Sequence, residues 1–359
     1  MLRLFVINPG STSTKVGVFE DGKEIFSKSV KHSGDVMKNY PDLKSQMPFR
    51  EGLIREIIEE ENIDLSTMDA FVGRGGVVHP LVGGVYEVNE AMKDDLESCR
   101  YGWHSSNMGG LLADVLAKPL GRKAYIADPV IVDEFEPLAR VSGWPEIERI
   151  SIFHALNQKA VARRYAKEHG QAYDELNLIV VHMGGGVSIG AHQKGRVIDV
   201  NNALTGDGPF SVERTGDLPL FSLIELCYSG QYTEAELKAQ LVGHGGLIAY
   251  LHTSDGLEID DRIEAGDDYA RYILEAMGYQ ISKEIGSAAT VLKGDVDQII
   301  LTGGLGRDPF LVDWITERTA WIAPITLYPG EDELGALADA VSEALAGNAP
   351  IRQYEKETE

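Results

Sequence analysis

Side chains that could bind a phosphate are concentrated in a short turn near the start of the chain. The apolar run Leu2–Ile7 ends at a turn signal, Asn8-Pro9-Gly10, and residues 16–19 resume an apolar pattern, so we expect a β-hairpin. Its tip carries Ser11, Thr12, Ser13, Thr14 and Lys15, and Asn8 begins the turn. Glycine lets a backbone approach a phosphate, hydroxyl and N–H groups donate to it, and lysine neutralises its charge. A polar loop without a ligand explains the same residues, and the spacing of a P-loop is absent.

A second strand–turn–strand pattern with a glycine-rich tip follows near the middle of the chain. The apolar run Leu176–Val181 leads into His182 and then into three consecutive glycines, Gly184, Gly185 and Gly186. This repetition predicts a duplicated fold whose two tips face each other across a cleft and hold nucleotide phosphates. A single histidine at a strand end is, on its own, more often structural than catalytic.

Two charged residues follow predicted strands directly. Arg74 stands in the glycine-rich turn after the strand pattern of residues 65–72, where an arginine can hold a carboxylate in a bidentate fork. Asp128 follows the short strand 124–127, where a carboxylate can hold Mg²⁺ or its water shell. A solvated surface arginine and a helix cap before Pro129 are the structural alternatives.

Composition limits the classes of protein and partner. The 359 residues are 43% hydrophobic and 25% charged, which is typical of a globular protein long enough for two domains. The net charge of −23, without a Lys/Arg-rich run, argues against nucleic acid and anionic membrane as partners. Two cysteines, no signal-peptide layout and no apolar run of ~18 residues favour a cytoplasmic protein that is not in the membrane.

The order of the predicted elements indicates an α/β fold class. Three strands within residues 2–30, a helix over 50–62 and a strand over 65–72 match the start of a ribonuclease-H-like fold. We therefore expect two ribonuclease-H-like domains with a cleft between them, as in actin, Hsp70 and sugar kinases. In the acetokinase family, which this order of elements resembles, the last helix returns to the first domain, so the resemblance implies a first domain of residues 1–150 plus 331–359 and a second of residues 151–330. The polar residues after Pro350 are expected to fray.

These motifs, taken in order, resemble the acetokinase family over most of the chain, from Leu2 to about Leu337. The opening turn resembles that family's first phosphate loop, and His-Met-Gly-Gly-Gly resembles its His-Leu-Gly-Asn-Gly run. The run Gly-Arg-Gly-Gly-Val-Val-His-Pro keeps the family's Arg and Val-Val-His but changes their surroundings. That departure, the Asp-Pro turn at 128 and the Pro-Gly-Glu-Asp-Glu segment at 329 look most like the butyrate kinase branch of the family.

The resemblance implies roles for individual residues. Arg74 would meet the substrate carboxylate, while His182 and Arg214 would stabilise the transferring phosphoryl group. Asp255 would lie on the nucleotide side, and the glycines that follow the strand at 296–301 would lie against the adenosine. Those glycines are Gly303, Gly304 and Gly306. The implied Mg²⁺ site draws on Asp128 and on the acidic start of the last helix, Glu331, Asp332 and Glu333, which could equally complement the helix dipole.

The implied reaction is reversible, ATP-dependent phosphorylation of butyrate, or of a similar short or branched carboxylate, to the acyl phosphate plus ADP. ATP or ADP and Mg²⁺ would take part, and the protein would form a homo-oligomer, a dimer or larger. The residues leave open an acetate or propionate kinase, an ATP-hydrolysing or phosphatase-like enzyme, and a non-catalytic nucleotide-binding scaffold as in actin.

Overall fold

The computed structural model describes residues 1–357, without the side chains of residues 34 and 35. This chain divides into two compact units, which we describe separately. Unit 1 comprises Met1–Val132 with Asp332–Glu359, and unit 2 comprises Asp133–Glu331. The first boundary falls earlier than the expected residue 150, because the segment after Val132 is bonded to unit 2. Glu134 pairs with Lys159 at 2.9 Å, and Arg149 pairs with Asp199 at 2.9 Å.

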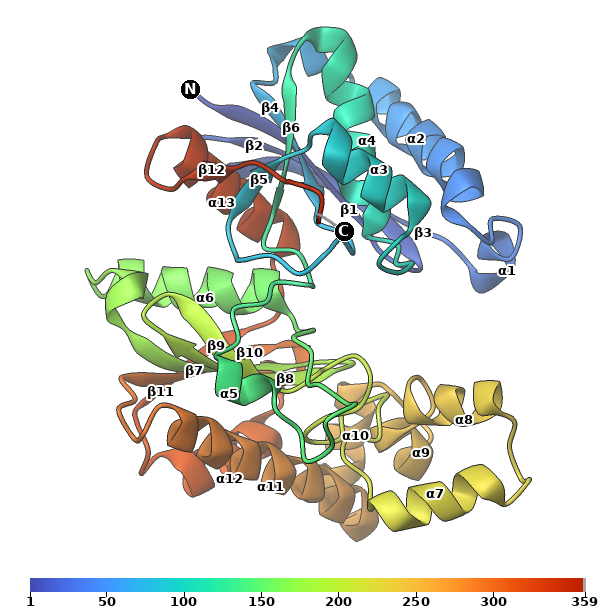
Figure 1. Cartoon of the computed structure of the whole chain (residues 1–359), viewed down its shortest axis with the longest axis vertical. Helices are drawn as coiled ribbons and strands as arrows, with labels where there is room; N and C mark the ends of the chain where they lie inside the picture. Colours follow the sequence, from blue (N-terminus) through green and yellow to red (C-terminus); the bar gives the residue numbers. More distant parts are fainter. Residues whose placement is uncertain (358–359) are drawn as a thin grey trace. The chain divides into compact units, whose positions relative to one another are not determined.

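Unit 1 is a seven-stranded sheet covered by helices, with strand order β12-β5-β6-β4-β1-β2-β3 (Figure 1). Its strands are β1 Arg3–Pro9, β2 Ser13–Glu20, β3 Lys23–Lys31, β4 Ala70–Arg74, β5 Val85–Glu87, β6 Lys123–Ala127 and β12 Ile351–Arg352. Its helices are α1 Gly34–Met37, α2 Leu43–Glu60, α3 Glu90–Ser98, α4 Asn107–Ala117 and α13 Glu333–Leu345. Helices α4 and α13 pack on opposite faces of β1, β4 and β6.

Unit 2 has a five-stranded sheet of order β11-β10-β7-β8-β9 (Figure 1). Its strands are β7 Asn177–Met183, β8 Val187–Gln193, β9 Arg196–Val200, β10 Gln298–Gly303 and β11 Ile325–Pro329. Its helices are α5 Pro137–Arg140, α6 Ala155–Glu168, α7 Leu220–Tyr228, α8 Glu234–Leu241, α9 Gly246–Leu251, α10 Gly256–Glu264, α11 Asp268–Val291 and α12 Pro309–Thr319. A 3₁₀ turn, Gly304–Arg307, follows β10.

The two sheets share one topology. Unit 1 contains the order β3-β2-β1-β4-β6 and unit 2 the order β9-β8-β7-β10-β11. In each, the first three strands form an antiparallel meander and the next two run parallel to the first strand. The duplicated strand arrangement predicted from the two hairpins is therefore present in the fold.

Alternating side chains of β7 show how the sheet of unit 2 builds its core. Ile179 and Val181 point into a cluster with α11 and α12, whereas Leu178 and Val180 pack against α6 on the other face. Because both faces are covered by helices, β7 is apolar along nearly its whole length. Its two polar residues are Asn177, which begins the strand, and His182, near its carboxyl end.

Helix α2 starts earlier than the expected residue 50. Asp42 caps it by accepting a hydrogen bond from Ser45 N at 2.8 Å, and the Ser45 hydroxyl completes a reciprocal capping box. The apolar stripe that indicated the helix continues toward its start as buried polar residues, Gln46 and Arg50. Periodicity of apolar residues alone therefore located only the second part of this helix.

The expected fraying after Pro350 is wrong for the described residues up to 357. Strand β12 adds to β5, and the side chain of Tyr354 is buried. Its hydroxyl donates to Asp95 Oδ2 at 2.7 Å, and its ring stacks on His79 at 4.6 Å between centroids. Burial and the Asp95 carboxylate raise the pKa of the Tyr354 phenol, which therefore remains a hydrogen-bond donor.

Within residues 1–357, no helix combines the length and the apolarity that crossing a membrane requires.

The C-terminal anchor gives a stability prediction. Tyr354→Phe removes the hydroxyl that binds the buried Asp95 carboxylate, and we expect a loss of about 1–3 kcal/mol in the free energy of unfolding, measured by urea denaturation. Tyr269→Phe, at an exposed tyrosine of α11, is the matched control and should change little. Equal stability of wild type and Tyr354→Phe would contradict the anchoring role.

Candidate active site

Two neighbouring parallel strands bring the first group of predicted site residues together in unit 1. Strands β1 and β4 pair in register from Leu4 and Ala70 to Ile7 and Gly73. Asn8 and Arg74 therefore follow at the same edge of the sheet. A Cβ on Gly73 would lie 2.1 Å from Gly109 O, so only glycine lets α4 pack this closely beside Arg74.

Arg74 holds a carboxylate of its own chain. Its Nη1 pairs with Glu333 Oε1 and lies 3.4 Å from Asn8 Oδ1. Asn8 Nδ2 donates to Glu333 Oε2. Glu333 is the first residue of α13, so the helix dipole also favours its negative charge. At this edge of unit 1, one guanidinium nitrogen of Arg74 and the amide of Asn8 therefore hold the Glu333 carboxylate.

The hairpin tip predicted as a phosphate loop is shaped by a residue that sequence reasoning missed. Arg50 of α2 is fully buried, and its guanidinium donates to Ser13 O at 2.8 Å, to Gly10 O at 2.8 Å and to Thr14 Oγ1 at 2.9 Å. The side chains of Ser11 and Thr12 are exposed, and those of Ser13 and Lys15 are half-buried. Arg50 therefore fixes the loop backbone while leaving these hydroxyl groups accessible.

In unit 2, His182 lies among three polar side chains. Its Nδ1 is 2.9 Å from Asn157 Oδ1, and its Nε2 is 3.1 Å from Glu331 Oε1. Its ring stacks on that of His154, with centroids 3.7 Å apart and planes 11° from parallel. His154 and Asn157 come from the first turn of α6, where residues three apart share one helix face.

The triple-glycine tip and Arg214 form one cluster. A Cβ on Gly186 would lie 1.8 Å from Arg214 Nη1, so the guanidinium occupies the space that any side chain there would fill. Arg214 Nη1 donates to Ala203 O, while its Nε is buried without a partner among the described residues. Ser211 Oγ donates to Gly185 O at 2.6 Å and fixes the tip. Burial lowers the pKa of Arg214, but this guanidinium remains charged at neutral pH.

The predicted adenosine motif begins with a glycine that is required by the backbone. Gly303 has φ 88°, and a Cβ there would lie 2.3 Å from Met183 O. Gly304 and Gly306 follow in the 3₁₀ turn. Asp255 caps α10 by accepting from Leu257 N at 3.0 Å, and a Cβ on its neighbour Gly256 would lie 3.4 Å from Leu305. Asp255 therefore lies near the glycine turn, where it makes the bond of an ordinary helix cap.

The predicted Mg²⁺ ligands already have structural contacts. Asp128 is buried with φ 38°, and its Oδ1 accepts from Gly84 N at 2.7 Å. Asp332 caps α13 by accepting from Gly335 N at 2.9 Å. No three His, Cys, Asp or Glu side chains within residues 1–357 are grouped as a metal site. All four predicted ligands nevertheless offer the oxygen donors that Mg²⁺ prefers, and one or two carboxylates with substrate phosphates suffice for it.

Sequence reasoning missed three residues around these clusters, and each left a signal. Arg50 continues the buried stripe of α2 at four-residue spacing with Gln46 and Ile54. His154 and Asn157 stand at i and i+3 at the start of a helix, which aims two polar side chains toward one neighbour.

Comparisons with known proteins agree on one family. The model of the acetokinase family matches residues 147–316. The chain is 51% identical over 352 residues to butyrate kinase 2 of Clostridium acetobutylicum, covering 98% of this chain and 99% of the relative. It is 49% identical over 354 residues to butyrate kinase 1 of the same organism, covering 99% of this chain and 100% of the relative.

Solved structures confirm the predicted fold class. Acetate kinase of Porphyromonas gingivalis aligns with a TM-score of 0.79 at 18% identity, covering 95% of this chain and 99% of that one. A propionate kinase of Francisella tularensis aligns with a TM-score of 0.74 at 16% identity, covering 95% and 99%. At these identities the likeness shows the fold alone.

Beside the glycine turn, two carboxyl groups make unit 2 sensitive to pH. Asp308 caps α12 by accepting from Leu311 N at 2.9 Å, while its Oδ2 and Asp260 Oδ1 are buried without a partner among the described residues. Burial, with repulsion from Asp260, raises the pKa of Asp308 to about 7. A proton shared between the two carboxyl groups would satisfy both oxygens.

This pair gives a prediction with a definite sign. The unfolded Asp308 ionises near pH 4, so between pH ~4 and 7 the folded state binds more protons and stability falls as pH rises. Asp308→Asn keeps a capping side chain but cannot ionise. We expect it to remove about 1 kcal/mol or more of the stability loss between pH 5.5 and 8, measured by thermal and urea unfolding.

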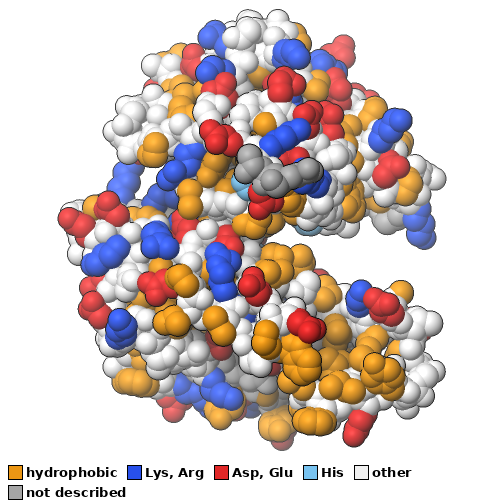
Figure 2. All heavy atoms as spheres, in the orientation of Figure 1, with side chains coloured by type: hydrophobic (Ala, Val, Ile, Leu, Met, Phe, Trp, Pro, Cys, Tyr) orange, Lys and Arg blue, Asp and Glu red, His pale blue; other side chains and the backbone are white. Residues whose placement is uncertain are grey.

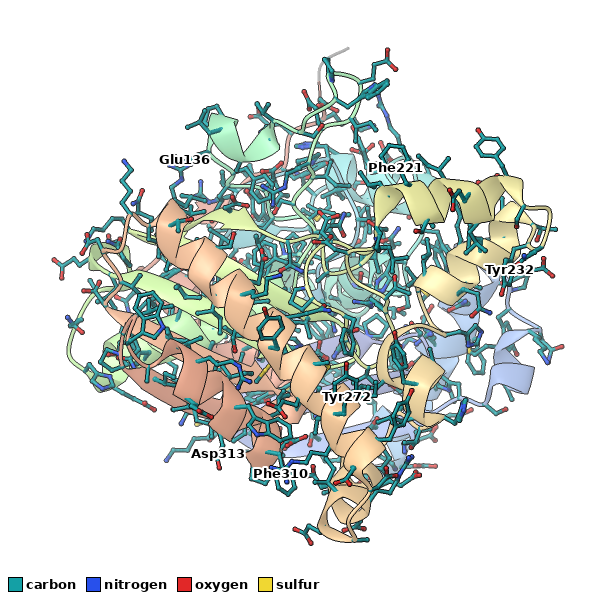
Figure 3. All side chains as sticks on the ribbon, turned by 90° about the horizontal axis from the view of Figure 1, so that it is seen from below. Glu136, Phe221, Tyr232, Tyr272, Phe310 and Asp313 are labelled. Atoms are coloured by element: carbon teal, nitrogen blue, oxygen red, sulfur yellow. The ribbon has the colours of Figure 1, made fainter. Side chains whose placement is uncertain are left out.

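Asp313→Asn, at an exposed position of the same helix (Figure 3), is the matched control for this experiment. It should keep the pH dependence of wild type. Other buried carboxyl groups contribute to the wild-type slope, so the difference between the two variants is the informative quantity. An identical slope in both variants would show that Asp308 does not titrate in this range.

Proposed function

Because this chain belongs to the acetokinase family, we propose that it is a butyrate kinase that transfers the γ-phosphoryl group of ATP reversibly to butyrate or a similar short or branched carboxylate. The products are an acyl phosphate and ADP. The observation that carries the proposal is the guanidinium of Arg74, which binds the Glu333 carboxylate at the carboxyl ends of β1 and β4. A substrate carboxylate would take the same kind of contact.

The proposed reaction requires little proton transfer by the protein. A short carboxylic acid is ionised at pH 7, so its oxygen attacks phosphorus without a general base. Catalysis then consists of orienting the carboxylate and neutralising charge on the phosphoryl oxygens. Arg74 supplies orientation, because a guanidinium binds both carboxylate oxygens in a fixed plane.

Unit 2 supplies the groups for the phosphoryl oxygens in this proposal. Arg214 lies against the Gly184–Gly186 tip with a buried Nε that lacks a partner among the described residues, which suits a site built for an anionic ligand. His182 ends β7 beside this tip and adds a hydrogen-bonding ring. Gly303, Gly304 and Gly306, with Asp255, would form the adenosine side. Unit 2 is accordingly the nucleotide side and unit 1 the substrate and phosphate side.

Asn8, with the hydroxyl groups of Ser11, Thr12 and Ser13 and the amine of Lys15, would complete the phosphate contacts of unit 1. Mg²⁺, when bound with the nucleotide, would neutralise phosphate charge. The predicted carboxylates that would take part are Asp128, Glu331, Asp332 and Glu333. Asp332 is engaged as a helix cap, and both oxygens of Glu333 contact Arg74 or Asn8.

Steady-state kinetics with a panel of carboxylates test the proposal. We expect ADP formation to depend on the added carboxylate, with kcat/KM higher for butyrate or isobutyrate than for acetate or propionate. Preference for acetate would identify an acetate kinase, and carboxylate-independent ADP formation would identify an ATP-hydrolysing enzyme. ATP binding without turnover would favour a nucleotide-binding scaffold.

Arg74→Ala tests the proposed carboxylate contact. Loss of a charge-assisted hydrogen-bond partner should cost at least ~2 kcal/mol of transition-state stabilisation, or ~30-fold in kcat/KM. Arg74→Lys should recover only part of this activity because it keeps the charge but loses the fork. Arg55→Ala, at an exposed arginine of α2, is the control. Near-normal kcat/KM in Arg74→Ala would remove this residue from the site.

We also propose that the protein is a homo-oligomer that associates through α7. This helix has no buried residue, although six of its nine residues are large and apolar or aromatic. Phe221 and Tyr228 are 84% and 88% exposed. Hydrophobic side chains gather over this part of unit 2 in Figure 2, and Figure 3 shows Phe221 on α7. Two chains of net charge −23 repel, so a helix with a single charged residue, Glu225, is suited to self-association.

Phe221→Glu should weaken this association by placing a charge in the apolar contact. Light scattering coupled to size exclusion should give a multiple of 39.2 kDa for wild type and a shift toward the monomer for the variant. Leu138→Glu, at an exposed leucine of α5, should keep the wild-type mass. A monomeric wild type at micromolar concentration would refute the proposal.

A further inference from the structure

A chain of polar side chains runs through the interior of unit 2 between α6 and β8. Gln158, Ser188 and His192 are each 0% exposed. Buried polar groups of this kind are normally satisfied by defined partners, so their donors and acceptors can be assigned by elimination. The chain ends at His154, the histidine that stacks on His182.

The orientation of the Gln158 amide is fixed by a backbone carbonyl. One end of the amide is 3.1 Å from Ser188 O and 2.7 Å from Ser188 Oγ. A carbonyl oxygen only accepts, so the amide nitrogen must face it and donate. The amide oxygen then faces His192 Nε2 at 2.9 Å and accepts from it.

The same elimination assigns the proton of Ser188. Its Oγ accepts from Gln158 Nε2, and its own proton needs an acceptor because the hydroxyl is fully buried. His154 Nδ1 lies 2.9 Å away. Ser188 can therefore donate to His154 Nδ1, and a neutral His154 ring that accepts there carries its proton on Nε2.

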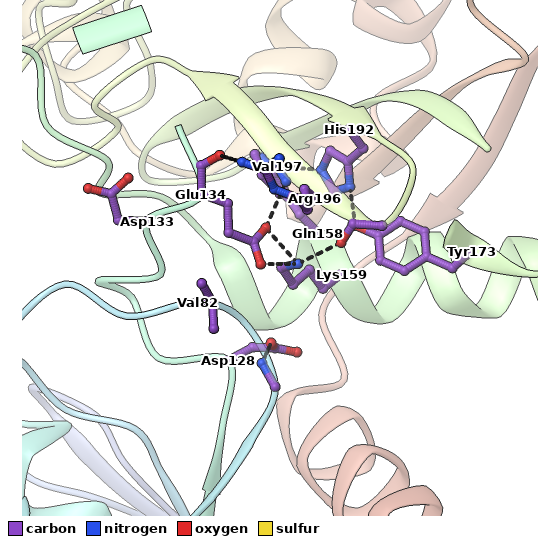
Figure 4. Close-up of polar contacts among 12 residues, drawn as sticks. Val82, Asp128, Asp133, Glu134, Gln158, Lys159, Tyr173, His192, Arg196 and Val197 are labelled. Atoms are coloured by element: carbon purple, nitrogen blue, oxygen red, sulfur yellow. Dashed lines mark hydrogen bonds and ion pairs between the residues drawn. The ribbon is translucent and has the colours of Figure 1, made fainter. Parts of the chain in front are cut away.

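The contacts of His192, at the other end of these polar side chains, agree with this assignment. The Tyr173 hydroxyl donates to His192 Nδ1 at 2.8 Å, which agrees with a proton on His192 Nε2. Burial, with the nearby cations Lys159 and Arg163, lowers the pKa of His192 well below its ordinary value, so this ring stays neutral. Figure 4 shows Lys159 paired with Glu134 beside Gln158, His192 and Tyr173.

Strand β8 leaves room for these buried polar side chains at one glycine, Gly190. A Cβ on Gly190 would lie 2.3 Å from Gln158 Oε1 and 3.0 Å from His192 Nε2. The backbone of Gly190 is in the ordinary strand region, so the glycine serves the close approach of Gln158 and not a special φ.

We propose that Gln158 is a positioning residue that sets the tautomer of His154, so that the ring stacked on His182 presents an N–H at Nε2. The inference rests on the proposed phosphoryl transfer for its purpose, because an N–H donor suits anionic phosphoryl oxygens whereas a bare ring nitrogen repels them. Gln158 acts through Ser188 and touches no reacting atom. In this proposal, the tautomer of His154 is therefore set by residues buried inside unit 2.

Gln158→Glu tests this assignment most sharply. A carboxylate at position 158 cannot donate to Ser188, so the Ser188 hydroxyl turns toward it and His154 Nδ1 becomes a donor. Two-bond ¹H–¹⁵N spectra of histidine-labelled full-length protein report the tautomer, with the resonance assigned from His154→Gln. We expect the Nε2–H tautomer in wild type and its loss in Gln158→Glu.

Kinetics supply the second readout. Gln158→Glu and Gly190→Ala, which displaces the amide without removing a polar group, should both lower kcat by ~10-fold or more with small changes in the KM for ATP and carboxylate. Gln171→Met, at an exposed glutamine, is the control and should match wild type. If Gln158→Glu does not fold, Gly190→Ala and the wild-type spectrum still decide the assignment.

A wild-type His154 protonated on Nδ1 would overturn the proposal, as would an unchanged tautomer and kcat in both variants. A loss of thermal stability with unchanged kcat would assign Gln158 a structural role only. A wild type that phosphorylates no carboxylate would refute the proposed function, whereas the spectra would still test the tautomer.

Discussion

Parallel pairing of two strands, made once in each unit, is the constraint on which the rest of the structure depends. The pairs β1–β4 and β7–β10 align the carboxyl ends of their strands, and Asn8, Arg74, His182 and Gly303 lie at those ends. Each pair is closed by a glycine that no other residue could replace without a shift. Gly73 lies against the backbone of Gly109, and Gly303 against that of Met183. The candidate site residues are therefore positioned by strands whose backbone hydrogen bonds make them more rigid than loops.

Buried polar residues form a second level of organisation beneath these strand ends. Arg50 binds three acceptors of the first hairpin, and Gln158 links β8 to the start of α6. A buried polar group without a partner costs more free energy than a hydrogen bond contributes net to stability. The surrounding backbone therefore has to adopt the geometry that satisfies these groups. A buried polar side chain of a helix thus fixes the neighbouring turn in unit 1 and contacts the neighbouring strand β8 in unit 2.

Charge is distributed in a way that suits anionic ligands despite the net charge of −23. Arg74 and Arg214 are partly buried, and each is held close to its sheet edge by a contact with its own unit, Glu333 or Ala203. Local cations of this kind attract an anion at short range while the surface as a whole is acidic. The Glu333 contact also means that a bound carboxylate would exchange with one already present at Arg74.

The sequence by itself determined the order of the main strands and turns and nominated much of the candidate site. The two apolar runs with turn tips predicted both hairpins, because alternation and turn residues are local properties. Arg74, His182 and the glycine tips could be nominated because strand ends recur at one edge of such sheets. Their roles in the reaction remain proposals, and the acidic residues 331–333 could not be ranked from their order in the chain.

Only the tertiary structure decided which of these residues meet, since such contacts join segments far apart in the chain. Glu333 contacts Arg74 across 259 positions, and Tyr354 is buried against Asp95 although its segment is polar enough to suggest fraying. Arg50 and Gln158 lie inside helices and resemble solvated residues until the neighbouring backbone is known. A buried polar side chain is defined by the partners that satisfy it, and those partners exist only once the chain has folded.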